Sequence, residues 1–185
     1  MQLNFWLKTN KNKTAISSES DKKENIRDIL LLVAVILFVL LSFGFIFFKD
    51  NYGIGIIKSP SIDKSILLYK RHFNNEDLQK DRLVFFLMPV ESIYFKKDSK
   101  FGKYIRCKEG EVLTIKNLDY FCEGKFIGSA KTKDKDGRDV KTFVFNGVIP
   151  KDKFFVMGTH ERSFDSRYWG FVDKNRIKGV SIWDI

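Results

Sequence analysis

Three short segments, far apart in the chain, carry side chains that could cut a peptide bond. The first is Ser59-Pro60-Ser61-Ile62, the second begins at Lys103, and the third covers residues 158–170. A serine hydroxyl attacks a peptide carbonyl once a base takes its proton, and a lysine amine can be that base only when it is neutral. The usual pKa of lysine lies near 10.4, and burial lowers it because burial penalises the ammonium form. The residue types therefore allow serine/lysine peptidase chemistry, although a lysine in so lysine-rich a chain is an ordinary surface residue unless its context says otherwise.

Other chemistries find less support. The chain holds two His and two Cys, with no Cys-x-x-Cys pair, so the sequence predicts no metal site and implies no cofactor. His160 is an alternative base and Ser65 an alternative nucleophile. Cys107 and Cys122 flank an expected hairpin, where they form either a disulfide, which an oxidising compartment permits, or two separate buried thiols.

An uncharged apolar stretch, 29–48, predicts a membrane anchor. A helix of this length spans about 30 Å, the thickness of a hydrocarbon core. A cleaved signal peptide fits poorly, because the apolar run is long and no small-x-small site follows it. Most basic residues near the anchor precede it, namely Lys8, Lys11, Lys13, Lys22, Lys23 and Arg27, whereas Lys49 and Lys58 follow it. The positive-inside rule then predicts a cytoplasmic tail over 1–28 and an outer domain over 49–185. Within the tail, the polar, Lys- and Ser-rich stretch from Thr9 to Glu24 is expected to be disordered.

The outer domain reads as mainly β. Short apolar or β-branched runs separated by Gly, Asp and Pro predict strands over 82–88, 112–115, 141–145 and 154–157, and the polar stretch 70–81 predicts a surface loop. The net charge of +10 comes from scattered basic residues without a nucleic-acid-binding motif, so no nucleic-acid partner is expected.

The three segments together resemble the type I signal peptidases, and more closely their TraF-type relatives that serve conjugative transfer. Ser-Pro-Ser-Ile stands just after the anchor, as the nucleophile segment of that family does. Lys103-Tyr-Ile-Arg-Cys-Lys-Glu-Gly110 keeps the lysine seven residues before a glycine. The segment Ser163-Phe-Asp-Ser-Arg-Tyr-Trp-Gly170, preceded by Gly158-Thr-His-Glu-Arg, matches the third and most specific motif. The resemblance covers roughly residues 52–182.

This resemblance implies a coiled β-sheet catalytic domain and a Ser/Lys dyad. Ser61 would be the nucleophile and Lys103 the general base. The backbone N–H of Ser61 and the hydroxyl of Ser59 would form the oxyanion hole, and Ser163 would orient the amine of Lys103.

The remaining site residues would act in support. Asp165 and Arg167 would form an ion pair that supports their loop, and Ile62 would line the pocket for the small residue before the cut. The sequence departs from the family pattern in places: Tyr104 replaces the usual arginine, and no proline follows Ser61 closely, where Asp63 stands instead.

The expected function is therefore that of a single-pass serine endopeptidase of a bacterial inner membrane, with its catalytic domain in the periplasm. Its substrates would be exported precursors, with prepilin or other components of a conjugative transfer apparatus expected first, because Thr159-His160-Glu161 is the variant associated with transfer peptidases. The alternatives are the general signal peptidase of its cell and an inactive scaffold of a secretion complex. Resolution of the acyl-enzyme by a pilin amine, which would give a cyclic product, is also open.

Overall fold

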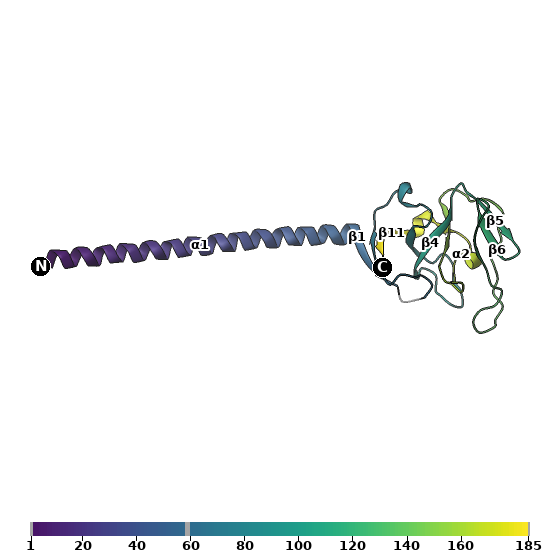
Figure 1. Cartoon of the computed structure of the whole chain (residues 1–185), viewed down its shortest axis with the longest axis horizontal. Coiled ribbons are helices and arrows are strands. Elements are labelled where there is room, and N and C mark those ends of the chain that lie inside the picture. Colours follow the sequence, from purple (N-terminus) through teal and green to yellow (C-terminus); the bar gives the residue numbers. More distant parts are fainter. Residues whose placement is uncertain (1, 58–59, 185) are drawn as a thin grey trace. The chain divides into compact units, whose positions relative to one another are not determined.

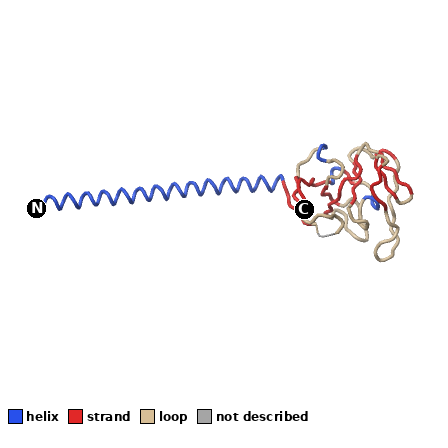
Figure 2. Tube along the Cα trace, viewed as in Figure 1, coloured by secondary structure: helices blue, strands red, loops and turns tan. Residues whose placement is uncertain are grey.

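The computed structural model describes residues 2–57 and 60–184. The chain divides into two compact units, and the second unit begins at Asp50. The first unit is helical and the second is built mainly of strands, as Figures 1 and 2 show.

Helix α1, Gln2–Asn51, contains the apolar stretch. Its segment Asn25–Asn51 is long and apolar enough to cross a membrane. The stretch from Thr9 to Glu24 was expected to be disordered, and that expectation is wrong, because the backbone of α1 is helical from Gln2 onwards. The tail contains neither Pro nor Gly. Extending an existing helix adds a hydrogen bond per residue without a new nucleation cost, which accounts for its helical backbone.

The second unit holds two antiparallel sheets. The larger sheet has the strand order β1-β2-β11-β3-β4-β9-β10, and the smaller sheet has the order β7-β6-β5-β8. The strands of the larger sheet are β1 Tyr52–Ile56, β2 Ile66–Lys70, β3 Leu83–Leu87, β4 Lys100–Lys108, β9 Lys153–Met157, β10 Val172–Asp173 and β11 Ile177–Asp184. Those of the smaller sheet are β5 Val112–Lys116, β6 Asp119–Cys122, β7 Lys125–Ser129 and β8 Gly147–Val148. Short helices occur at Asn75–Asp77 (η1), Ser166–Trp169 (α2) and Lys174–Arg176 (η2).

The mainly β fold class is confirmed, and so are three of the four expected strands, which correspond to β3, β5 and β9. The strand expected over 141–145 is wrong, because this segment makes no ladder. The backbone N–H of Phe143 donates to the carbonyl of Arg167 at 2.8 Å, and the carbonyl of Phe143 accepts from the hydroxyl of Tyr120 at 2.7 Å. The backbone groups of Phe143, at the centre of the segment, are thus bonded to the loop around α2 and to a side chain rather than to a neighbouring strand.

The core is divided between the sheets. One cluster packs Phe86, Ile105 and Val156 with neighbours inside the larger sheet, and a second joins the two sheets around Tyr120 and Phe155. A disulfide links Cys107 of β4 to Cys122 of β6, with Cα atoms 5.6 Å apart. The strand that carries Lys103 is therefore tied covalently to the smaller sheet.

Candidate active site

Ser61 lies in the loop that connects β1 to β2. These strands pair antiparallel, and the loop is closed by the N–H of Ile57, which donates to the carbonyl of Ser65 at 2.9 Å. The carbonyl of Ser61 accepts from the N–H of Thr159 at 3.0 Å. Next to it, Ile62 buries its side chain against Leu67. The loop is thus held by backbone bonds at its base and at Ser61, and by an apolar anchor beside Ser61.

Lys103 lies in the middle of β4, opposite Val84 of β3. Its side chain is only 2% exposed, and its Nζ lies 2.6 Å from Oγ of Ser61, within hydrogen-bond distance. Residues 42 positions apart in the chain therefore meet as a hydroxyl and an amine. With the amine neutral, the same contact lets the hydroxyl donate to Nζ, which is the geometry that a general base needs.

Burial lowers the pKa of Lys103 from its ordinary value of 10.5 to about 8. The carboxylate of Asp165 acts in the opposite direction, and the guanidinium of Arg167 adds to the lowering. Desolvation is the largest of these effects, because an ammonium that leaves water loses solvation that one hydrogen bond does not replace. The amine is accordingly neutral in a substantial fraction of molecules at mildly alkaline pH.

Asp165 and Arg167 form a buried, two-pronged ion pair. Nε and Nη2 of Arg167 each donate to a different carboxylate oxygen of Asp165, both at 2.8 Å. The two side chains are 0% and 3% exposed, so the charges stabilise each other where water does not reach them. Asp165 also accepts from the N–H of Gly158 at 3.0 Å. The pair therefore holds the chain just before Thr159, whose N–H bonds to Ser61.

Ser163 is buried beside the β1–β2 loop that carries Ser61, but its hydroxyl does not make the expected hydrogen bond with Lys103. Its hydroxyl has no hydrogen-bond partner among the described residues. It lies next to Gly158: a Cβ atom added to Gly158 would overlap both Oγ of Ser163 and the carbonyl oxygen of Ser61. A buried hydroxyl without a partner costs roughly 1–3 kcal/mol. Ser163 therefore lies at the site, but its hydroxyl does not form the hydrogen bond that would orient the amine of Lys103.

The predicted oxyanion hole is described in part. Ser59 lies outside the described residues. The assignment of Ser59 and of the Ser61 N–H stays a prediction.

An open groove of about 930 Å³ surrounds the dyad. Ser61, Lys103, Ser163 and Ile62 line it. Much of the wall is aliphatic or aromatic: Ile54, Ile56, Ile57, Tyr69, Phe85, Tyr94, Phe95, Phe101, Phe164 and Tyr168. Charged side chains also line the groove: Lys100, Lys131, Lys133, Asp134, Lys135 and Arg162. A groove of this composition can hold a short stretch of extended, apolar peptide across the reacting pair.

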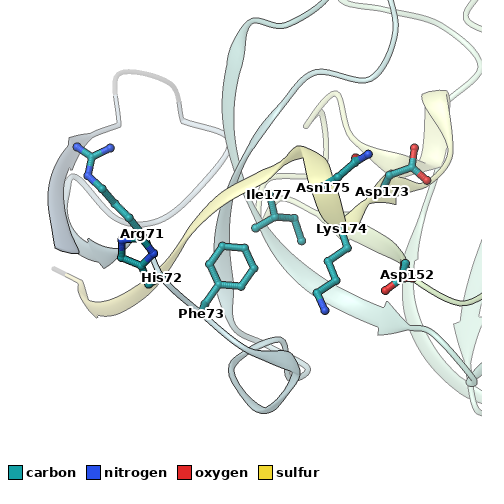
Figure 3. A pocket seen from close by; sticks show the side chains of 8 residues that line it. All are labelled: Arg71, His72, Phe73, Asp152, Asp173, Lys174, Asn175 and Ile177. Carbon is teal, nitrogen blue, oxygen red and sulfur yellow. The ribbon is translucent and has the colours of Figure 1, made fainter. Parts of the chain in front are cut away.

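The alternative residues fit the site less well. His160 lines the groove, but its Nδ1 accepts from the N–H of Arg162 at 3.1 Å within an exposed turn. Ser65 is exposed and does not line the groove. A second pocket, seen in Figure 3, shares no lining residue with the groove, and none of its eight lining side chains carries a hydroxyl or thiol. The groove is thus the place where described residues combine a nucleophile with a base.

Sequence reasoning missed the backbone contacts that hold the dyad. The motif contains Gly158 and Thr159, yet their contributions are the absence of a side chain and a main-chain N–H, neither of which side-chain chemistry reveals. The close approach of Gly158 to Ser61 follows only from the fold.

Comparison with known proteins identifies the family. The family model for signal peptidase, peptidase S26, matches residues 25–184. A 39-residue stretch, 20% of this chain, is 46% identical to signal peptidase I of Buchnera aphidicola subsp. Schizaphis graminum and 56% identical to that of subsp. Baizongia pistaciae. The matches cover only 12% and 13% of the length of these relatives. A signal peptidase I from Enterococcus faecalis aligns with a TM-score of 0.38 and 21% identity, over 55% of this chain and 94% of that one. Because the family model matches most of its length, the chain belongs to the signal peptidase family, peptidase S26.

Proposed function

We propose that the protein is a membrane-anchored serine endopeptidase that removes leader peptides from exported precursor proteins. The observation that carries this proposal is the buried amine of Lys103, 2.6 Å from the hydroxyl of Ser61 in an apolar groove. The membership of the signal peptidase family supplies the substrate class, because precursors with a leader are what a signal peptidase takes.

The dyad would act in two stages. Neutral Lys103 takes the proton of Ser61 while Oγ attacks the scissile carbonyl, and the resulting ammonium then protonates the departing amine. This leaves an ester between Ser61 and the leader peptide. Lys103, neutral again, takes a proton from water, the hydroxide attacks the ester, and the ammonium returns its proton to Oγ. The Ser61 N–H and the Ser59 hydroxyl are the proposed donors to the oxyanion in both stages.

Of the two candidate roles, that of a general signal peptidase, which acts on secretory precursors, is preferred. The matching relatives are named signal peptidase I, and none of these matches points to conjugative transfer. A dedicated enzyme for pilin or another transfer component remains the second candidate, favoured by the Thr159-His160-Glu161 variant of the third motif. Acyl transfer to a pilin amine would use the same ester and differs only in the acceptor.

The anchor would place the enzyme at the inner membrane. Helix α1 crosses the inner membrane once, with its N-terminus in the cytoplasm, and residues 49–185 lie in the periplasm. A precursor emerging through the same bilayer presents its cleavage site close to the membrane, so an anchored enzyme meets it at a high effective concentration.

Processing in cells tests the proposal. Wild type, Ser61→Ala and Ser65→Ala would each be expressed in a strain depleted of its own signal peptidase, and a secretory precursor and a prepilin would be followed on immunoblots. We expect Ser61→Ala to accumulate the uncleaved secretory precursor and Ser65→Ala, the matched control, to process it. Processing by membrane-inserted Ser61→Ala would exclude this nucleophile. Cleavage of prepilin alone by wild type would replace the general assignment with the dedicated one.

A further inference from the structure

We propose that Tyr104 is a positioning residue: its hydroxyl donates to the carboxylate of Asp63 and so restrains the β1–β2 loop that carries the nucleophile Ser61. Oη of Tyr104 lies 3.1 Å from Oδ1 of Asp63. This inference rests on the proposed function in that it assigns a role for catalysis to residues outside the dyad.

The contact joins the same two segments that the dyad joins. Tyr104 follows Lys103 in β4, and Asp63 stands two residues after Ser61. The loop is thus attached to β4 at two neighbouring points, once through the reacting atoms and once through a bond that takes no part in the chemistry. The second attachment restrains Ser61 also when its hydroxyl leaves Lys103 to attack the substrate.

The ring of Tyr104 is itself held in place. It packs against the cluster of Ile62, Leu67 and Leu83, and it lies opposite Leu83 in the ladder between β3 and β4. The guanidinium of Arg106 lies 5.1 Å from the ring centre and is paired with the carboxylate of Asp81. Because the ring is already ordered by these contacts, its hydroxyl binds Asp63 with little further loss of side-chain entropy.

Both partners are places where the sequence departs from the motifs it resembles. Tyr104 replaces the usual arginine, and Asp63 stands in a stretch after Ser61 that lacks the usual proline. A proline stiffens a loop through its fixed φ, whereas here a hydrogen bond to a rigid strand restrains the loop. The two departures meet in the fold, and this juxtaposition points to a shared role.

Kinetics of detergent-solubilised full-length enzyme on a peptide that spans a leader cleavage site test the proposal. The bond is exposed, so its effect is modest. We expect Tyr104→Phe and Asp63→Ala each to lower kcat about three- to tenfold with KM unchanged, and the double variant to lose no more than either single one. Asp63→Asn keeps an acceptor oxygen and should stay close to wild type. The pH midpoint of all variants should match wild type, because Lys103 is untouched.

Two outcomes would overturn the role: unchanged kcat in Tyr104→Phe, or losses that multiply in the double variant. Hydrogen exchange of the loop 57–65 gives a readout that needs no substrate. We expect faster exchange there in Tyr104→Phe than in wild type, and equal exchange would exclude the restraint even if the enzyme proved inactive on every precursor. Inactivity of wild type itself would instead count against the proposed function.

Discussion

At the scale of single residues, the site depends on one lysine that is buried although its charged form is more stable in water. Lys103 carries an amine that is more stable in water, yet it is buried beside Ser61 with a lowered pKa. The sequence identified both residues through the motifs they stand in. It could not show the burial, because the groups that meet Lys103 in the fold, Ser61, Asp165 and Arg167, stand more than 40 residues away in the chain.

The burial of Lys103 has a cost for stability that a substitution should reveal. Its folded-state pKa of about 8 lies below the unfolded value near 10.5. The unfolded state therefore binds more protons between these two values, and stability rises with pH across that window. Lys103→Met keeps an apolar side chain of similar size. We expect its free energy of unfolding at pH 7 to be about 1–3 kcal/mol higher than that of wild type.

Urea denaturation of the solubilised protein at pH 7 and pH 10 measures this effect. The additional stability of Lys103→Met relative to wild type should be present below pH 8 and should shrink towards pH 10.5. The variant should lack activity at every pH. Lys100→Met, an exposed lysine of the same strand, is the control and should change stability little. A destabilised Lys103→Met at pH 7 would show that the amine is well solvated in the folded protein.

At the scale of elements, the site is an assembly of one loop, one strand and one turn. The β1–β2 loop brings Ser61, β4 brings Lys103, and the turn after β9 holds the loop through the N–H of Thr159. Runs of apolar residues were sufficient to predict β3, β5 and β9. The segment 141–145 has the same composition, but its backbone finds partners in Arg167 and Tyr120, and such long-range competition is absent from any local pattern.

The turn after β9 leads to a prediction at Gly158. A Cβ atom there would overlap the carbonyl of Ser61, which is backbone and cannot move without the loop. Because a displacement of about 1 Å can cost on the order of 100-fold in rate, we expect Gly158→Ala to lower kcat about 100-fold or more. Thr159→Ala keeps the N–H that binds Ser61 and should retain most of the activity. Comparable activity in the two variants would contradict the close approach.

At the scale of the whole molecule, the two sheets of the second unit are joined by the disulfide between Cys107 and Cys122. The sequence left open whether these cysteines are bonded, because their spacing permits a bond without requiring one. Only the pairing of β4 with β9, and of β6 with β5, brings them to the facing sides of the two sheets. The membrane anchor was easier to predict from the sequence, because an uncharged apolar run of that length is typical of a membrane-spanning helix.

The disulfide should contribute to stability more than to the chemistry. It closes a loop of 15 residues, for which the chain-entropy model gives a stabilisation of about 3 kcal/mol. We expect the double substitution Cys107→Ala/Cys122→Ala to lower the free energy of unfolding by about 2–4 kcal/mol. Denaturation with and without reductant checks this. Wild type should lose stability on reduction and the double variant should not respond, whereas equal stability of oxidised and reduced wild type would contradict the assignment.

The central claim is that neutral Lys103 takes the proton of Ser61, and the pH dependence of cleavage tests it most directly. Initial rates of solubilised wild type on a peptide that spans a leader cleavage site, measured from pH 6 to pH 10 at low substrate concentration, give kcat/KM. Because the burial of Lys103 lowers its pKa to about 8, kcat/KM should rise with pH and level off above a midpoint near that value. A profile that is flat over this range would show that the titrating amine of Lys103 is not the base.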